Sequence, residues 1–218
     1  MPRLALFGVT SGRLPETLRD RESPQSDSHA CTFANPSTRR LPKPEPDWGI
    51  RGDHGHLAQA LAGDLAAALD PCELAKRVNL APDSWQAQLL RSTSKRQLVL
   101  CSRQSGKSTM AAVAACHTSL YEPGSLTLLV SPSERQSGEF FKRCRGIFRS
   151  LGWPVAARTE SALRIELENG SRIVALPGSE STVRGYSAVR LLVLDEAARI
   201  PPELITATSR CWQSLEAA

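Results

Sequence analysis

One nine-residue segment carries the residue types of a phosphate-binding loop. Cys101 to Thr109 reads Cys-Ser-Arg-Gln-Ser-Gly-Lys-Ser-Thr, which matches the P-loop pattern G-x-x-x-x-G-K-[ST] except at Cys101, where the first glycine would stand. In this pattern Gly106 lets the backbone approach phosphate oxygens, Lys107 reaches the β- and γ-phosphates, and the Ser108 hydroxyl ligates Mg²⁺. The segment therefore predicts nucleotide binding, and the alternative is an ordinary strand-to-helix turn. The predicted nucleotide contacts are Arg103, Gln104, Ser105, Gly106, Lys107, Ser108 and Thr109.

A pair of carboxylates supplies the chemistry that such a loop lacks. Asp195 and Glu196 directly follow the apolar run Leu191–Leu194. At the carboxyl end of a buried strand, Asp195 can hold Mg²⁺ directly or through water, and Glu196 can polarise a water for attack on the γ-phosphate. Paired acids at the entry to a loop are also common without any function. The P-loop earlier in the chain favours the catalytic interpretation.

Three further residues are weaker candidates. The Gln86 amide, after Trp85, could read the N6/N7 edge of adenine, or it could be a surface glutamine on a capped helix. Arg184, before Gly185, and Arg103, inside the loop, could offset charge on a γ-phosphate in the transition state. Both arginines could equally be solvated loop residues.

The composition is that of one globular α/β domain. Hydrophobic residues make up 41% of the 218 residues and charged residues 22%, and the net charge of +5 permits a nucleic-acid partner without arguing for one. No apolar run approaches the roughly 18 residues of a membrane-spanning helix. The six cysteines contain no Cys-x-x-Cys pair, which predicts free thiols in a reducing cytosol rather than a zinc site.

Buried strands alternate with helices from residue 97 onward. This order predicts a mainly parallel sheet wrapped by helices on both sides. Asn169-Gly170 between two alternating runs predicts a hairpin. Residues 1–56 hold seven of the 15 prolines and are predicted to form a disordered arm, followed by the ATPase-like domain at 57–218. Helices are expected at 57–69, from 71, around 84–90, at 110–121 and at 133–152, and strands at 97–101, 126–130, 162–168, after 170 and at 190–194.

Four segments together resemble one family. They are Pro82-Asp-Ser-Trp-Gln-Ala-Gln-Leu-Leu-Arg, Ser-Arg-Gln-Ser-Gly-Lys-Ser-Thr, Leu-Pro-Gly178-Ser-Glu-Ser-Thr-Val-Arg-Gly-Tyr and Leu-Val-Leu-Asp-Glu-Ala-Ala-Arg-Ile-Pro. In order and spacing they resemble the ATPase domain of the large terminase subunit of tailed phages, over about residues 57–208. In that family another residue stands in place of the first P-loop glycine, and in this chain that residue is Cys101. The resemblance implies adenine recognition by Gln86, Mg²⁺ coordination by Asp195 and catalysis by Glu196. It also implies roles at the γ-phosphate for Arg103 and Arg184.

The resemblance also implies partners. A complete relative would use ATP and Mg²⁺ in a homo-oligomeric ring to move double-stranded viral DNA, together with the small terminase subunit and the portal. The expected location is the cytoplasm of the bacterial host, with no membrane partner. Two alternatives remain, which are a helicase-like DNA-dependent ATPase and a non-functional prophage remnant.

The carboxyl-terminal end departs from this family. Relatives continue past the second acid motif to a coupling motif and an RNase H-like nuclease domain, whereas this chain ends at Ala218. Codons for residues 209–217 can be chosen so that a shifted frame spells the family-like Met-Leu-Ala-Val-Ser-Gly-Gly. We therefore expect a frameshift near codons 206–209 and a truncated ATPase domain without a nuclease. In such a domain the ATP-binding residues are present, and hydrolysis coupled to DNA movement is lost or severely weakened. The alternative is a genuine short protein with its own carboxyl terminus.

Overall fold

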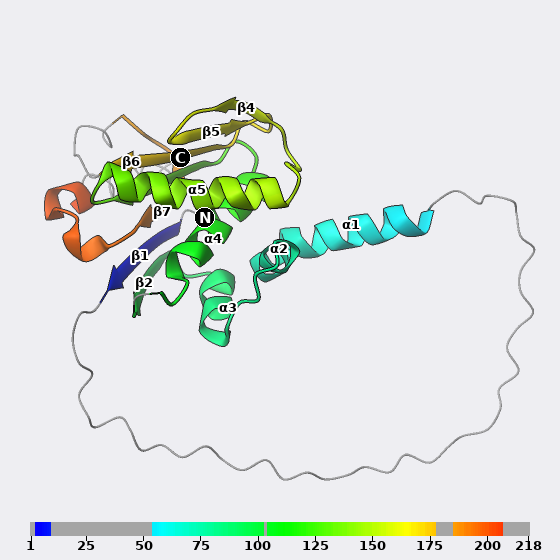
Figure 1. Ribbon diagram of the computed structural model, residues 1–218, viewed down its shortest axis with the longest axis horizontal. Helices are drawn as coiled ribbons and strands as arrows, with labels where there is room; N and C mark the ends of the chain where they lie inside the picture. Colours follow the sequence, from blue (N-terminus) through cyan, green and yellow to red (C-terminus); the bar gives the residue numbers. More distant parts are fainter. Residues whose placement is uncertain (1–2, 10–53, 103, 178–184, 207–218) are drawn as a thin grey trace, which may run out of the picture.

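A single mixed sheet organises the part of the chain that the computed structural model describes, which is residues 3–9, 54–102, 104–177 and 185–206. The order of the strands is β2-β1-β7-β3-β6-β5-β4 (Figure 1). The strands from β2 to β6 in this order pair in parallel. Strand β5 pairs antiparallel with β6, and β4 pairs antiparallel with β5. The predicted mainly parallel sheet is therefore confirmed. The strands are β1 (Arg3–Val9), β2 (Arg96–Cys101), β3 (Leu126–Ser131), β4 (Ala157–Glu160), β5 (Arg164–Leu167), β6 (Arg172–Pro177) and β7 (Val189–Leu194).

The helices begin where the sequence supplies capping groups. The Asp70 carboxylate accepts a hydrogen bond from the backbone N–H of Cys72, and Pro71 occupies the first turn of α2. Ser133 accepts from the backbone N–H of Gln136 and caps α5. Both starts were predicted from the sequence. The helices are α1 (His54–Leu69), α2 (Pro71–Arg77), α3 (Ser84–Arg91), α4 (Lys107–Tyr121) and α5 (Glu134–Ser150), with the 3-10 helix η2 at Ala197–Arg199.

The predicted hairpin is confirmed between β5 and β6. Gly170 has φ +81°, a conformation that favours glycine, and the Asn169 side chain accepts a hydrogen bond from the backbone N–H of Ser171. A second bond from the Asn169 amide to the carbonyl of Ser119 ties the turn to α4. The turn therefore fixes both the register of the hairpin and its position on the domain.

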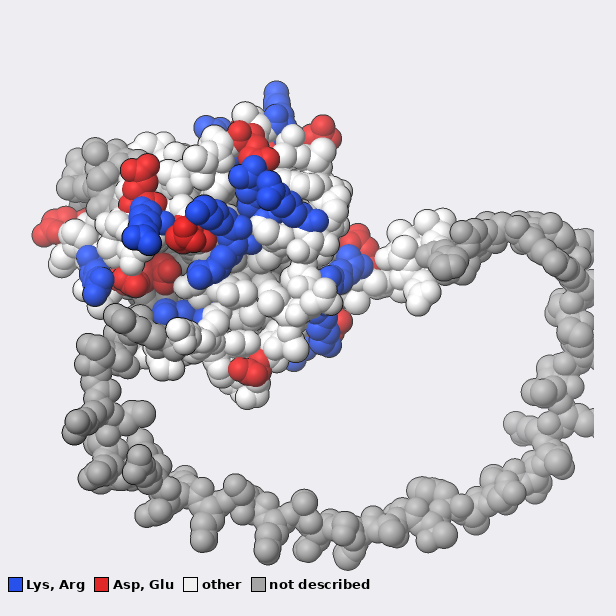
Figure 2. Space-filling model, in the orientation of Figure 1, with Lys and Arg blue, Asp and Glu red and all other residues white. Residues whose placement is uncertain are grey.

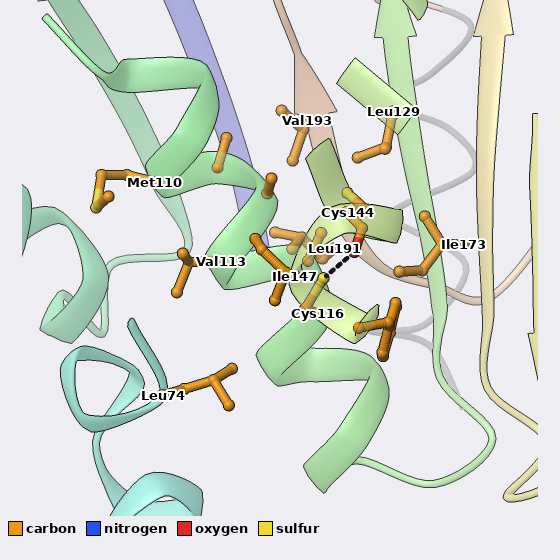
Figure 3. Close-up of a cluster of buried hydrophobic side chains, with 14 of the residues drawn as sticks. Leu74, Met110, Val113, Cys116, Leu129, Cys144, Ile147, Ile173, Leu191 and Val193 are labelled. Atoms are coloured by element: carbon orange, nitrogen blue, oxygen red, sulfur yellow. Dashed lines mark hydrogen bonds between the residues drawn. The ribbon is translucent and has the colours of Figure 1, made fainter. Parts of the chain in front are cut away.

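Helices α4 and α5 cover one face of the sheet. Val113 and Cys116 of α4 and Ile147 of α5 are buried against Leu191 and Val193 of β7 (Figure 3). The Cys116 thiol lies 3.5 Å from the backbone oxygen of Cys144 on α5. Within the described residues, Cys72, Cys101, Cys116 and Cys144 are free thiols, in agreement with the sequence, whereas Cys31 and Cys211 lie outside them.

The opposite face of the sheet is covered only in part by described residues. Leu128, Val130, Leu192 and Leu194 are buried with Ile200 and Leu204. On β2, however, Leu98 is 65% exposed and Leu100 is 60% exposed. The prediction that residues 97–101 form a strand buried on both faces is therefore wrong. Strand β2 is an edge strand of the sheet, and no described segment packs over these two leucines.

Helix α1 is also less buried than its pattern suggests. Its leucines at every fourth position, Leu57, Leu61, Leu65 and Leu69, are 60–78% exposed. Helix α1 instead contacts the rest of the domain through Ala67, which is fully buried, and through Asp64, which pairs with Arg77 of α2. Figure 1 shows α1 extending away from the sheet, and the space-filling view in Figure 2 shows the same helix projecting from the rest of the domain. The predicted face of the helix exists, but in this structure it does not pack on the core.

The amino-terminal prediction needs the largest correction. Residues 1–56 were predicted to form an arm outside the core, yet Arg3–Val9 form the strand β1 inside the sheet. The run Leu-Ala-Leu-Phe is too short to show a periodicity, but it can pair with strands on both sides. Residues 10–53 and 207–218 lie outside the described residues, so the remainder of the predicted arm and the shifted-frame segment are not tested. No described helix is long and apolar enough to cross a membrane.

Candidate functional site

The predicted P-loop connects the end of β2 to the start of α4. Gln104 has φ +62° and Gly106 has φ +82°, so the backbone turns sharply before the helix. Gly106 is the N-cap of α4, and Lys107 is its first residue. The first N–H groups of a helix have no acceptor within the helix and carry the positive end of its dipole. This end of α4 is therefore suited to phosphate oxygens.

The structure brings this loop to the second motif. The Ser108 hydroxyl donates a hydrogen bond to Oδ2 of Asp195 over 3.2 Å. The Asp195 backbone N–H donates to the carbonyl of Val130 at 2.9 Å, so the aspartate continues the ladder between β7 and β3. Its other carboxylate oxygen accepts from the Glu196 N–H at 3.1 Å. Two motifs distant in sequence thus share one hydrogen bond at the carboxyl edge of the sheet.

The environment of Asp195 fits a divalent cation. Burial raises the pKa of Asp195 above its usual value, while the hydrogen bond from Ser108 and the charge of Lys107 act in the opposite direction. Burial thus disfavours the charged carboxylate, and a cation beside it would favour that form again. A serine hydroxyl and a carboxylate are ligands typical of Mg²⁺. Ser108 and Asp195 are thus the residues that would hold the ion.

Glu196 is placed by an unusual backbone conformation. Its φ of +51° and ψ of +43° lie in the left-handed region, which is strained for a side chain of this kind. Its Oε2 atom is buried and accepts no hydrogen bond from a described residue, although Arg199 Nη1 lies 3.5 Å away. A buried carboxylate oxygen with remaining acceptor capacity can orient a water molecule.

Gln86 lies against the P-loop. Its Nε2 donates to the Ser105 carbonyl at 3.0 Å, and its Oε1 accepts from the Asp83 N–H at 3.0 Å. A Cβ added at Gly106 would come within 2.8 Å of the same Nε2. The amide therefore links the start of α3 to the loop. Its second N–H and second lone pair could still read adenine, and that role stays a prediction.

Replacing Gln86 with alanine separates these two roles. If the amide mainly supports the loop, the affinities for ATP and GTP should both fall by about fivefold, the value of one net hydrogen bond. If it reads adenine, only ATP binding should weaken. Fluorescence titration with both nucleotides measures the ratio. Gln88→Ala is the matched control, since Gln88 lies exposed on the same helix, and it should change neither affinity.

Two predicted residues lie outside the described part of the chain, and one residue was missed. Arg103 of the loop and Arg184 lie outside the residues that the structure describes. Ser131, which the sequence analysis did not select, ends β3 beside Asp195, and its buried hydroxyl has no described hydrogen-bond partner. A polar residue directly after the apolar run 126–130 was the available signal.

Known proteins of two kinds are similar to this chain. Residues 98–217 match the family model of the helicase domain of the RNA cytidine acetyltransferase NAT10/TcmA. They span more than half of the chain and include the P-loop and Asp195–Glu196, so at the level of this nucleotide-binding core the chain belongs to that family of ATPase domains. The large terminase subunits of Thermus phage G20c and Thermus virus P23-45 are each 33% identical to the chain over 139 residues.

The described part of the chain is an ATPase domain of the terminase large-subunit type. It corresponds to the amino-terminal ATPase domain, and the aligned region covers 55% of this chain and 28% of each phage relative. The solved ATPase domain of the Thermus phage P74-26 large terminase has the same fold, with a TM-score of 0.56 and 22% identity over 66% of this chain and 63% of that one. A mutant form of that domain gives the same TM-score at 21% identity, over 65% of this chain and 64% of that one.

The helicase model does not alter the assignment to the terminases. It fits a helicase-like ATPase as well, but it does not favour that alternative over the terminase family. This chain spans less than a third of the length of the curated relatives that it matches. Family membership therefore applies to the ATPase domain, whereas the activities of the whole protein are matters of proposal.

Proposed function

We propose that this terminase domain binds ATP with Mg²⁺ and hydrolyses it as part of a motor that moves double-stranded DNA. The hydrogen bond between Ser108 and Asp195 is the observation that carries the proposal. It joins the phosphate-binding loop to the carboxylate pair, which is the arrangement that phosphoryl transfer to water requires.

The residues divide the chemistry among them. Gln104 to Thr109 would surround the phosphates, and the Lys107 ammonium would offset negative charge on the β- and γ-phosphates. Bound Mg²⁺ would supply further charge neutralisation between Ser108 and Asp195. Glu196 would accept a proton from a water that attacks the γ-phosphorus. The bond from the γ-phosphorus to the bridging oxygen then breaks, which releases ADP and phosphate.

Further parts of the proposal concern residues and partners outside the described structure. Arg103 and Arg184 would approach the γ-phosphate from the loop and from the segment before β7. Double-stranded DNA would be contacted through its phosphates, since a motor that moves along DNA needs no base readout. A homo-oligomeric ring, the small terminase subunit and the portal are the proposed partners in the cytoplasm of a bacterial host.

ATP turnover by the purified chain tests the proposal. We expect Mg²⁺-dependent release of phosphate by the chain, and no separation of the strands when double-stranded DNA is added. A forked duplex with a fluorophore and a quencher serves as the second substrate. Strand separation on that fork would favour the helicase-like alternative. A folded chain that binds no nucleotide would support the prophage-remnant alternative.

A further inference from the structure

Strand β1 lies inside the sheet, between the edge strand β2 and β7. It pairs in parallel with β2 from Leu4 opposite Arg96 to Val9 opposite Cys101. On its other side it pairs in parallel with β7 from Arg3 opposite Leu191 to Leu6 opposite Leu194. The first strand of the chain is therefore enclosed by two strands that lie about 90 to 190 residues later in the sequence.

These two neighbours carry the two halves of the nucleotide site. The P-loop follows β2, and Asp195 and Glu196 follow β7. Described residues of β2 and β7 do not pair with each other, because β1 separates them. Adjacent strands lie about 4.8 Å apart, so β1 holds the two halves at about twice that spacing. Without β1, two rows of backbone N–H and C=O groups would face each other unpaired.

The remaining contacts between the two halves are few. The bond from Ser108 to Asp195 joins two side chains across this gap and cannot set the distance between two strands by itself. Helix α4 lies against both β1 and β7, but it packs through side chains, which fix the register of a backbone less strictly than a ladder does. In sequence, β1 is separated from α1 by the whole of residues 10–53. Its position therefore depends on the pairing and not on a short connection.

We propose that insertion of residues 3–9 between β2 and β7 assembles the nucleotide site. In this account β1 is a positioning element that sets the distance between the P-loop and the carboxylates, and the gap between β2 and β7 is a binding site for one parallel strand. The inference rests on the proposed function, because it concerns the same ATP site. It adds that the site is completed by a segment from the far end of the sequence.

The proposal is tested with a full-length variant that can be cut after β1 by a protease and in which a disulfide can hold β1 on β2. A protease site is inserted within residues 10–53, and cysteines replace Leu6 and Leu98, which are direct partners in the β1–β2 ladder. Facing positions on neighbouring strands are close enough for a disulfide. Leu98 is exposed, so its replacement should cost little stability. Oxidation then locks β1 in place, and a reductant releases it. Leu6→Cys alone is the matched control.

Affinity for a fluorescent ATP analogue is measured after cleavage and removal of any free amino-terminal peptide. We expect the oxidised protein to keep the affinity of the uncut chain. The reduced protein and the single-cysteine control should lose roughly tenfold or more, which corresponds to about 1.4 kcal/mol per factor of ten. Adding a synthetic peptide of residues 1–12 should restore binding, and a scrambled peptide should not.

Three results would overturn the proposal. One is full affinity in the reduced protein after mass spectrometry shows that the peptide has left. Another is failure of the two cysteines to cross-link. The third is loss of the far-ultraviolet circular dichroism together with affinity, because β1 would then be needed for the whole fold and not for the site. If the uncut chain binds no analogue, the proposed function fails, while cross-linking still reports on the position of β1.

Discussion

Replacing Lys107 with alanine should lower the affinity for ATP by roughly a hundredfold, the value of one or two hydrogen bonds to a charged group. Lys107 is the first residue of α4, and only 9% of it is exposed. Its charge therefore acts where solvent screens it weakly. Isothermal titration with a non-hydrolysable ATP analogue and Mg²⁺ measures the change.

The matched control for Lys107 is Lys142→Ala. Lys142 lies on α5 with 71% of its side chain exposed and pairs with Glu139. This substitution removes the same charge away from the loop, so the affinity should stay unchanged. Thermal melting of each variant shows whether the fold is kept. If folded Lys107→Ala binds the ATP analogue as tightly as the native chain does, this loop does not bind the phosphates.

Glu196→Gln should reduce ATP turnover by about 10²- to 10⁴-fold, the usual contribution of a general base. The amide has nearly the same shape as the carboxylate but cannot accept the proton of the attacking water. Asp195 and Ser108, which would hold Mg²⁺, remain in place. Binding of the ATP analogue should therefore be retained while phosphate release falls. A coupled phosphate assay and a binding titration on the same preparation separate the two effects.

An exposed glutamate near the same edge provides the comparison for Glu196. Glu203 lies seven residues further along the chain, and its side chain faces solvent. Glu203→Gln should leave turnover unchanged. Undiminished turnover in Glu196→Gln would mean that another group accepts the proton. The left-handed backbone at Glu196 would then have a structural cause and not a catalytic one.

Local patterns were sufficient to predict most elements of the fold. Asp70-Pro71 and Ser133 predicted two helix starts, and Asn169-Gly170 predicted the hairpin, because capping and turn geometry depend on a few neighbouring atoms. The apolar run at 126–130 predicted a fully buried strand, and every residue of β3 is buried. The run at 97–101 is similarly apolar, but it forms the edge strand β2. Burial depends on neighbours that a local pattern does not contain.

In the candidate site, too, local motifs indicated some residues, and only the tertiary structure placed the others. The order Gly106, Lys107 and Ser108 indicated phosphate binding, and Asp195 after an apolar run indicated a metal ligand, because each motif places its atoms through local backbone geometry. The sequence could not show that the amide of Gln86 is bonded to the loop carbonyl at Ser105. Nor could it select Ser131, whose position beside Asp195 follows from the pairing of β3 with β7.

By itself, then, the sequence determined the chemistry that is available and the type of sheet that presents it. Only the tertiary structure decided which strand separates the two motifs. Arg3–Val9 are too short and too far from their partners for any periodicity to place them. Their position is determined by hydrogen bonds to β2 and β7, which form only when distant segments meet. Long-range pairing of this kind depends on the whole sheet, and for this reason β1, the strand between the two motifs, is the element that a local pattern placed outside the core.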